Sequence, residues 1–241
     1  MSAERRKVGV LLPSSNTTVE YDFQRLVPGH ISLHAARMWL TGSDAAAAQA
    51  MNAELDTASH YLGSARLDLI VYACTGGSLD AGGIAERIRA HAGPVPVVAT
   101  APAAKLALDA LGMKRIAVAT PYQDSMTAAI GAHLGQAGYR VLALAGRRLP
   151  DNVAIGNDPV DAIAAFAKAT LPADADGLFL SCTNWRGLDV VERIERETGK
   201  PVVTSNQATI WATLRALGID APIAGYGRLL TLAPPNLAYA A

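Results

Sequence analysis

A repeat of 108 residues runs through this chain and constrains its fold more than any other feature. Residues 68–75 (DLIVYACT) resemble residues 176–183 (DGLFLSCT), and residues 7–13 resemble residues 115–121 at the same spacing of 108. A third pair, 96–112 and 201–218, is offset by two or three residues, as expected for a length change in a loop. A repeated unit of this size predicts two domains of the same structure.

Short runs rich in Val, Ile and Leu alternate along the chain with helical patterns. The predicted strands are 8–12, 67–72, 95–99, 116–119, 177–180 and 202–203. The predicted helices are 17–26, 45–65, 81–92, 103–111, 125–135, 159–170, 188–198 and 207–217. Continuously apolar strands are typical of parallel sheets covered by helices on both faces. We therefore predict an α/β protein of two pseudo-symmetric, Rossmann-like domains, each a doubly wound parallel sheet, with the active site between them.

The length of the chain suits this arrangement. Its 241 residues are enough for two domains that each bury a core of their own. We place the crossover near Gly112 and the return near Gly218, so the predicted first domain comprises residues 1–112 plus 218–241 and the second comprises residues 113–217. Residues 222–230 are expected to return to the first domain and close its sheet.

Charge and hydropathy exclude several classes of protein. Lys plus Arg and Asp plus Glu each number 21, so the chain has no excess of positive charge for binding a nucleic acid backbone. No apolar stretch approaches the roughly 18 residues that a membrane span needs. The amino-terminal residues lack the apolar segment of a signal peptide, which predicts a cytoplasmic protein with reduced thiols.

The two cysteines of the chain, Cys74 and Cys182, occupy matching places in the repeat. Each directly follows a predicted strand, at the carboxyl edge where open α/β sheets bind ligands, and each precedes a helix whose amino end favours thiolate. If the two halves face each other, the thiols approach one cavity from opposite sides. A buried structural cysteine and a disulfide are the alternatives, but the repeat-matched placement favours catalysis.

Polar loops follow the other strand ends. Residues 13–18 (PSSNTT) open a helix and place Ser15 and Asn16 where an anion would bind, and helix capping explains one such residue but not five in succession. The equivalent loop in the second half carries Tyr122. Residues 76–78 (GGS) offer backbone N–H groups to a small carboxylate. The spacing of neither dinucleotide-binding nor P-loop proteins is present, and the five histidines form no cluster with cysteine, so no metal site is expected.

Several segments together resemble a known superfamily: VGVLLPSSNTTVE at 8–20, YACTGGS at 72–78, PDN at 150–152, LSCTN at 180–184 and GYGRL at 225–229. The chain resembles the aspartate/glutamate racemase superfamily, and within it the branch of maleate cis-trans isomerases and arylmalonate decarboxylases. The resemblance spans nearly the whole chain. It implies two Rossmann-like domains that bind a small carboxylate or dicarboxylate between them without a cofactor, and it suggests a homo-oligomer.

The resemblance also implies roles for individual residues. Cys74 would be the isomerase nucleophile and Cys182 its partner acid. The predicted substrate-binding residues are Asn16, Ser15, Thr75, Tyr122, Asn152 and Thr183. The decarboxylases that the chain resembles keep only the second cysteine, so Cys74 argues against decarboxylation.

The leading hypothesis is a cofactor-independent isomerase that converts maleate to fumarate through a Cys74 thiolate adduct, with Cys182 managing protons. One alternative is a racemase, in which one cysteine takes an α proton from a chiral carboxylate and the other returns a proton to the opposite face. An arylmalonate-type decarboxylase is a further alternative. A solute-binding protein of two α/β lobes, with no need for thiols at its cleft, represents a different class.

Overall fold

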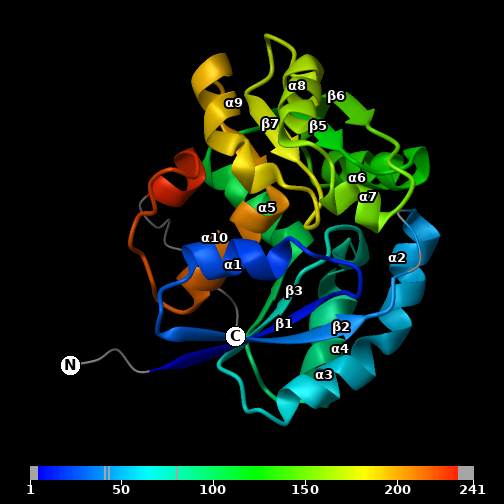
Figure 1. Cartoon of the computed structure of the whole chain (residues 1–241), viewed down its shortest axis with the longest axis vertical. Helices are drawn as coiled ribbons and strands as arrows, with labels where there is room; N and C mark the ends of the chain where they lie inside the picture. The colour runs from blue at the N-terminus through cyan, green and yellow to red at the C-terminus, as the bar shows by residue number, and fades with distance from the viewer. Residues whose placement is uncertain (1–4, 41, 43, 80, 233–241) are drawn as a thin grey trace.

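The computed structural model describes residues 5–40, 42, 44–79 and 81–232 of the chain. Its strands are, in chain order, β1 (Arg6–Pro13), β2 (Ile31–Met38), β3 (Leu69–Tyr72), β4 (Val97–Ala99), β5 (Arg115–Thr120), β6 (Arg140–Gly146), β7 (Gly177–Leu180) and β8 (Val202–Thr204). They form two four-stranded parallel sheets, in the orders β2-β1-β3-β4 and β6-β5-β7-β8. Figure 1 shows each sheet in a lobe of its own. The predicted α/β fold of two Rossmann-like units is confirmed.

Helices connect and cover the strands. The α-helices are α1 (Val19–Leu26), α2 (Ala45–Met51), α3 (Leu55–Gly63), α4 (Ala81–Ala92), α5 (Thr100–Ala110), α6 (Asp124–Gln136), α7 (Asn152–Gly156), α8 (Val160–Thr170), α9 (Val191–Thr198) and α10 (Ser205–Ala216). Short 3₁₀ turns are η1 (Asn52–Glu54), η2 (Gly76–Ser78), η3 (Gly187–Asp189) and η4 (Arg228–Thr231).

The sequence repeat is reproduced at the level of single hydrogen bonds. Val8 pairs with Leu69 in the first sheet, and Ile116 pairs with Gly177, which are the positions 108 residues later. The Asp68 carboxylate accepts the Lys7 N–H at 2.7 Å. Its equivalent Asp176 accepts the Arg115 N–H at 2.6 Å. Equal registers place both cysteine-bearing loops at the carboxyl ends of equivalent strands.

Two strands and one helix were not predicted from the sequence. Strands β2 and β6 lie at the outer edge of their sheets and are largely half-exposed, so they lack the continuous apolar run that marks the central strands. Helix α7 has five residues and carries no periodic pattern. The predicted helix 45–65 is wrong in one respect, because η1 divides it into α2 and α3.

The predicted return of residues 222–230 to the first sheet is also wrong. This segment contains no strand, and its residues 228–231 form η4, which packs against α10 and β8. The Arg228 N–H donates to the Glu195 carboxylate at 2.9 Å, so the segment is anchored to α9 of the second half. The domain boundaries themselves, 1–112 plus 218–241 and 113–217, stay a prediction.

Helices α5 and α10 join the two halves. They pack against each other between the lobes, and their apolar residues, Ala104 and Ile210 among them, belong to one continuous core. Each helix ends at a glycine in the left-handed region, Gly112 with φ +67° and Gly218 with φ +72°. Only glycine adopts this conformation without strain, and it reverses the chain after each helix. The lobes are therefore held by a shared core, which fixes the loops that face each other across the interface.

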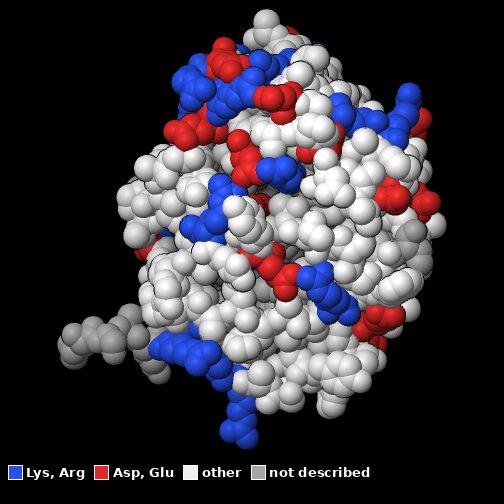
Figure 2. Space-filling model, in the orientation of Figure 1, with Lys and Arg blue, Asp and Glu red and all other residues white. Residues whose placement is uncertain are grey.

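Charges on the surface are mixed in sign. On the face drawn in Figure 2, basic and acidic side chains lie interspersed. Elsewhere in the structure as well as here, ion pairs form between such groups, for example between Arg193 and Glu197. Within the described part of the chain, no helix has the length and apolar character to cross a bilayer. Among the same residues, no group of three or more His, Cys, Asp or Glu is placed to hold a metal ion.

Candidate active site

A pocket opens where the loops at the carboxyl ends of the two sheets meet. The empty space between its walls is about 370 Å³ when the open solvent at its mouth is included. The lining residues are Pro13, Leu40, Gly42, Asp44, Ala48, Cys74, Gly76, Tyr122, Met126, Asn152, Cys182 and Thr183. They come from both halves of the chain, as expected for a ligand site between two facing α/β units.

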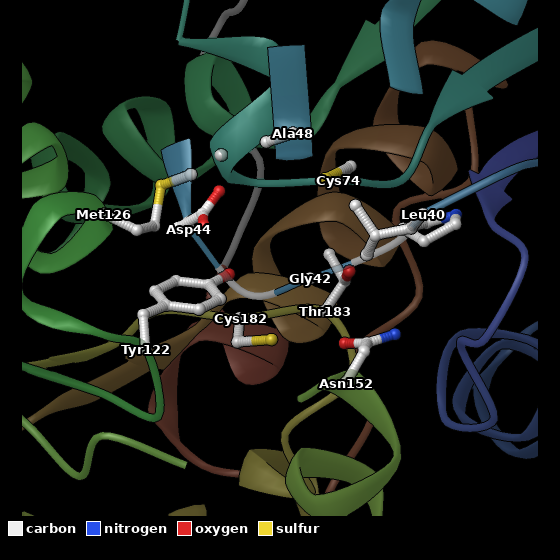
Figure 3. Close-up of a pocket in the computed structure, with 12 residues that line it drawn as sticks. Leu40, Gly42, Asp44, Ala48, Cys74, Tyr122, Met126, Asn152, Cys182 and Thr183 are labelled. Atoms are coloured by element: carbon white, nitrogen blue, oxygen red, sulfur yellow. The ribbon is translucent and has the colours of Figure 1, made fainter. Parts of the chain in front are cut away.

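Both cysteines line this pocket. Figure 3 shows Cys74 and Cys182 on opposite sides of it, with Tyr122 and Asn152 beside them. Each cysteine follows a central strand of its sheet, β3 or β7, after one intervening residue. Both are free thiols and almost fully buried. The two sulfurs therefore face a shared space without forming a disulfide.

Backbone N–H groups point at each sulfur. The Gly77 N–H lies 3.4 Å from Cys74 Sγ, and the Asn184 N–H lies 3.3 Å from Cys182 Sγ. Tyr122 adds a side-chain hydrogen bond to Cys182. Donors of this kind stabilise negative charge on sulfur, or on an anion bound beside it.

Burial nevertheless outweighs these donors. Desolvation raises the pKa of Cys74 to about 12, although the N–H groups of Gly77 and Gly76 act in the opposite direction. Burial also raises the pKa of Cys182, against the hydrogen bond from Tyr122. The expectation of thiolates stabilised by helix amino ends is therefore wrong, because burial favours the neutral form of both thiols. The 3₁₀ turn η2 follows Cys74, and Cys182 is followed by an irregular turn with η3 beginning only at Gly187, so neither cysteine lies at the first turn of an α-helix. The low dielectric of the site favours the neutral thiol.

The raised pKa of Cys74 predicts a pH-dependent reactivity. A thiol with a pKa near 12 has about one thiolate in 10,000 molecules at pH 8, and this fraction rises about tenfold for each pH unit. We therefore expect the alkylation of Cys74 by iodoacetamide to become about tenfold faster with each pH unit between about pH 7 and 10. Peptide mass spectrometry of the alkylated protein measures the rate. A rate that levels off below about pH 9 would contradict the effect of burial.

Tyr122 and Thr75 connect the two cysteine loops. Tyr122 follows β5, lies buried beside both sulfurs and is hydrogen-bonded to Thr75 as well as to Cys182. Burial, followed by the proximity of the two cysteines, raises the pKa of Tyr122 well above its usual value, so the phenol stays a hydrogen-bond donor. Thr75 Oγ1 lies 2.9 Å from Ser205 Oγ, which accepts the Cys182 N–H at 3.0 Å. Ser205, at the start of α10, thus ties both loops together, and sequence reasoning missed it.

The loop after β1 contacts the second half of the chain. Asn16 is fully buried, its Oδ1 accepts the N–H groups of Thr18 and Val19 at the start of α1, and its Nδ2 donates to Thr183 Oγ1 at 3.2 Å. Ser15 Oγ accepts from Asn152 Nδ2 at 2.9 Å. The structure thus brings these predicted residues together.

Not all predicted residues reach the pocket wall. Cys74, Cys182, Tyr122, Asn152 and Thr183 line it, whereas Ser15, Asn16 and Thr75 stand behind that wall and hold the lining residues by the hydrogen bonds described above. The hydrogen bonds that Asn16 Oδ1 accepts are those of a residue that caps the start of α1. Two arginines near these loops, Arg37 and Arg186, have other contacts.

Arg37 binds backbone carbonyl groups, and Arg186 forms an ion pair. Arg37 donates to the carbonyl oxygens of Ser14 and Asn16 at 3.0 and 2.8 Å, which holds the loop after β1 in place. Arg186 pairs with Asp189 at 3.0 Å. Neither side chain is among the residues that line the pocket.

Sequence reasoning also missed an apolar wall of the pocket. Leu40, Ala48 and Met126 form it, and Asp44, which accepts the Ala47 N–H at 2.7 Å and begins α2, lies next to it. Ala48 and Met126 lie within predicted helices and Leu40 in the segment before one of them, without a polar motif to distinguish them from ordinary core positions. Only the packing of α2 and α6 beside η2 reveals them.

Contact between Gly76 and Met126 predicts a substitution effect. A Cβ at Gly76 would lie 2.6 Å from Met126 Cε, so the flexible thioether, which lines the pocket, must move. We expect Gly76→Ala to lower kcat/KM on the substrate about tenfold with little loss of stability. Adding Met126→Ala is expected to restore most of the activity by vacating that space. Steady-state kinetics checks both variants, and a double variant no better than Gly76→Ala would contradict this account.

Comparison with known proteins adds independent findings. The family model of arylmalonate decarboxylase matches residues 8–230. The maleate isomerase of Pseudomonas putida is 28% identical over 242 residues, covering 93% of this chain and 97% of that protein. The maleate isomerase of Nocardia farcinica is 29% identical over 239 residues, covering 93% and 95%.

A solved structure is similar over the same length. It is a variant of the Nocardia farcinica maleate cis-trans isomerase with a covalently bound succinylcysteine intermediate. It matches with a TM-score of 0.88 at 28% identity, covering 94% of this chain and 98% of that chain. The family model, the relatives and this fold agree with the resemblance seen in the sequence, and together they show that the chain belongs to the arylmalonate decarboxylase family.

Proposed function

We propose that this protein isomerises maleate to fumarate without a cofactor, through a covalent adduct on Cys74. One observation carries the proposal: two buried, free thiols from equivalent positions of a repeat lie on opposite sides of one pocket. The covalent succinylcysteine in the similar Nocardia enzyme supports the same chemistry. Decarboxylation is less well supported, because it leaves the second thiol without a task.

The proposed reaction begins with addition to the double bond. Cys74 Sγ forms a bond to one alkene carbon, and Cys182 gives a proton to the other, which yields a succinyl thioether with a rotatable single bond. The proton released by Cys74 passes to Cys182 and replaces the one given to carbon, so one S–H bond remains in the pair. After rotation, the reverse elimination breaks the C–S and C–H bonds. Carbon returns its proton to Cys182, and Cys182 gives its own proton to the departing Cys74 sulfur, which restores both thiols and releases fumarate.

Neutral donors would hold the substrate carboxylates. The Tyr122 hydroxyl, the Asn152 amide and backbone N–H groups after each cysteine surround the pocket, and the described lining residues include no Lys or Arg. Preorganised donors in a site that excludes water stabilise the charge that spreads onto a carboxylate as sulfur adds. Ser15, Asn16 and Thr75 would hold these donors in position from behind the pocket wall. Thr183, which lines the pocket, would complete the set of groups around the substrate.

The direct test is to incubate the purified protein with maleate and follow fumarate by proton NMR. We expect conversion without added metal, nucleotide or other cofactor. A second incubation, in heavy water with chiral amino acids and hydroxy acids, tests the racemase alternative. Deuterium at the α carbon of such an acid, together with no activity on maleate, would overturn the isomerase. Tight binding of maleate without turnover would point instead to a binding protein.

Two further properties complete the proposal. We place the enzyme in the cytoplasm, where thiols stay reduced, and we expect it to assemble as a homo-oligomer. Sedimentation of the purified protein measures its mass in solution. A mass equal to that of a single chain would contradict the expected homo-oligomer.

A further inference from the structure

A buried carboxylate outside the pocket has no role in the reaction above. Asp22 lies on α1 with a side chain that is 3% exposed. Burial raises the pKa of Asp22 to about 7, while its hydrogen bond from Asn206 acts in the opposite direction. Burying a carboxylate is costly, so its partners indicate what this one holds in place.

The partner of Asp22 is the amide of Asn206, on α10. Asn206 Nδ2 donates to Asp22 Oδ2 at 2.7 Å and to the carbonyl oxygen of Thr183 at 2.9 Å. Above its pKa of about 7, Asp22 is ionised and only accepts hydrogen bonds, so in that pH range it sets the orientation of the Asn206 amide. With the opposite orientation, the amide oxygen of Asn206 would face the carbonyl oxygen of Thr183.

The carbonyl of Thr183 and the N–H of Asn184 belong to one peptide group. Because this group is planar and trans, its two polar atoms point in opposite directions. Asn206 holds the carbonyl on one side, and the N–H on the other side lies 3.3 Å from Cys182 Sγ. Three hydrogen bonds in series thus lead from the carboxylate on α1 to the sulfur in the pocket.

We propose that Asp22, acting through Asn206, is a positioning residue that holds the peptide between Thr183 and Asn184 so that its N–H faces Cys182 Sγ. This deepens the proposed function, since it names what orients the donor at the proton-transferring thiol. Asp22 lies in the first half of the chain and Cys182 in the second. Through this series of hydrogen bonds, the acidity of the Cys182 thiol also depends on how the two halves pack.

Other polar and charged groups lie near Asp22 and near Cys182. Arg25 lies 3.6 Å from Asp22, and Asp189 and Arg186 also act on its carboxyl group. Around Cys182, Tyr122 and the backbone N–H groups of Asn184 and Trp185 are the hydrogen-bonding neighbours. The test therefore needs a variant that changes the charges beside Asp22 and leaves its bond to Asn206 intact.

The experiment measures the acidity of Cys182 directly. In a Cys74→Ser background the sole thiol is Cys182, and the pH midpoint of its alkylation reports its pKa. Loss of one hydrogen bond to a charged group is expected to raise that midpoint by about one unit, which is about tenfold in thiolate at a given pH. We expect this shift in Asp22→Leu and in Asn206→Ala, and no further shift when both are combined.

Two variants serve as controls. Asp22→Asn keeps an oxygen acceptor for Asn206 and should stay within about 0.3 units of the parent, even if Asp22→Leu folds poorly. Asp189→Asn changes the charge beside Asp22 without touching Asn206 or Thr183, and it should leave the midpoint unchanged. A looser loop would change the limiting rate of alkylation and not its midpoint. Unchanged midpoints in both Asp22→Leu and Asn206→Ala would overturn the proposal, as would an equal shift in Asp189→Asn.

Activity gives a second readout. With Cys74 present, Asp22→Leu should lower kcat on maleate about tenfold and leave KM within about twofold, because the substrate contacts remain. A comparable rise in KM with unchanged kcat would contradict a positioning role at Cys182. The alkylation midpoint needs no turnover, so failure of the maleate reaction and failure of this inference are distinguishable.

Discussion

Replacement of Cys74 by serine is expected to lower maleate turnover by roughly 10⁴-fold or more, in the range seen when an enzyme loses its nucleophile. An alcohol in the same buried pocket ionises far less readily than a thiol and forms no comparable adduct. Cys182→Ser is expected to lower turnover as well, because proton transfer to and from carbon then lacks its partner. Steady-state kinetics with maleate measures both effects.

Mass spectrometry separates the roles of the two thiols. After incubation with maleate, a succinyl group is expected on Cys74 in the Cys182→Ser variant and on no residue in Cys74→Ser. Ser181→Ala is a matched control, since the Ser181 hydroxyl is buried next to Cys182 with no hydrogen-bond partner among the described residues. This variant should keep wild-type turnover. An adduct found only on Cys182 would reverse the assignment of the roles.

Substitution of Gly77 by alanine is expected to lower the free energy of unfolding by about 3 kcal/mol, a large value for one methyl group. Its Cβ would overlap the hydroxyl oxygen of Tyr72, whose ring is completely buried. That hydroxyl is hydrogen-bonded to Asn52, and Asn52 in turn donates to the Gly77 carbonyl at 3.1 Å. Relief of the clash therefore displaces the turn whose N–H faces Cys74 Sγ, and activity falls with stability.

Denaturant unfolding measures the stability of Gly77→Ala, and Gly135→Ala provides a matched control. Gly135 lies on the exposed side of α6, and a Cβ at this position would meet no atom within 4 Å. Gly135→Ala should therefore be neutral or stabilise the fold by up to about 1 kcal/mol. Adding Tyr72→Phe to Gly77→Ala removes the oxygen involved in the clash and should recover part of the loss. An unfolding free energy of Gly77→Ala within about 0.5 kcal/mol of wild type would show that the turn adapts freely.

The central strands were predictable because they are short, apolar and buried on both faces. β3 and β7 are buried throughout, and the pattern of Val, Ile, Leu and Phe identifies them without ambiguity. The edge strands β2 and β6 escaped prediction because half-exposed positions tolerate polar residues and carry little signal. In the same way, the cysteines and Tyr122 stood out by repeat position, whereas Met126 and Leu40 resemble any core residue.

The balance between opposing effects at the thiols was not predictable. Nearby N–H donors favour thiolate and are implied by the local sequence, but the extent of desolvation depends on how closely the two halves approach. Ser205 illustrates the same point, since its hydroxyl contacts Thr75 and Cys182 across 130 and 23 residues of sequence. No local pattern encodes such a contact.

The repeat in the chain was sufficient to establish two equivalent α/β units and one cysteine at the end of a central strand in each, because the apolar patterns that mark the central strands are contained in short segments. The packing of α1 and α5 against α10 then set the burial of both sulfurs and the path from Asp22 to Cys182. Those properties arise from contacts between residues far apart in the chain, whose free energy depends on the complete three-dimensional arrangement.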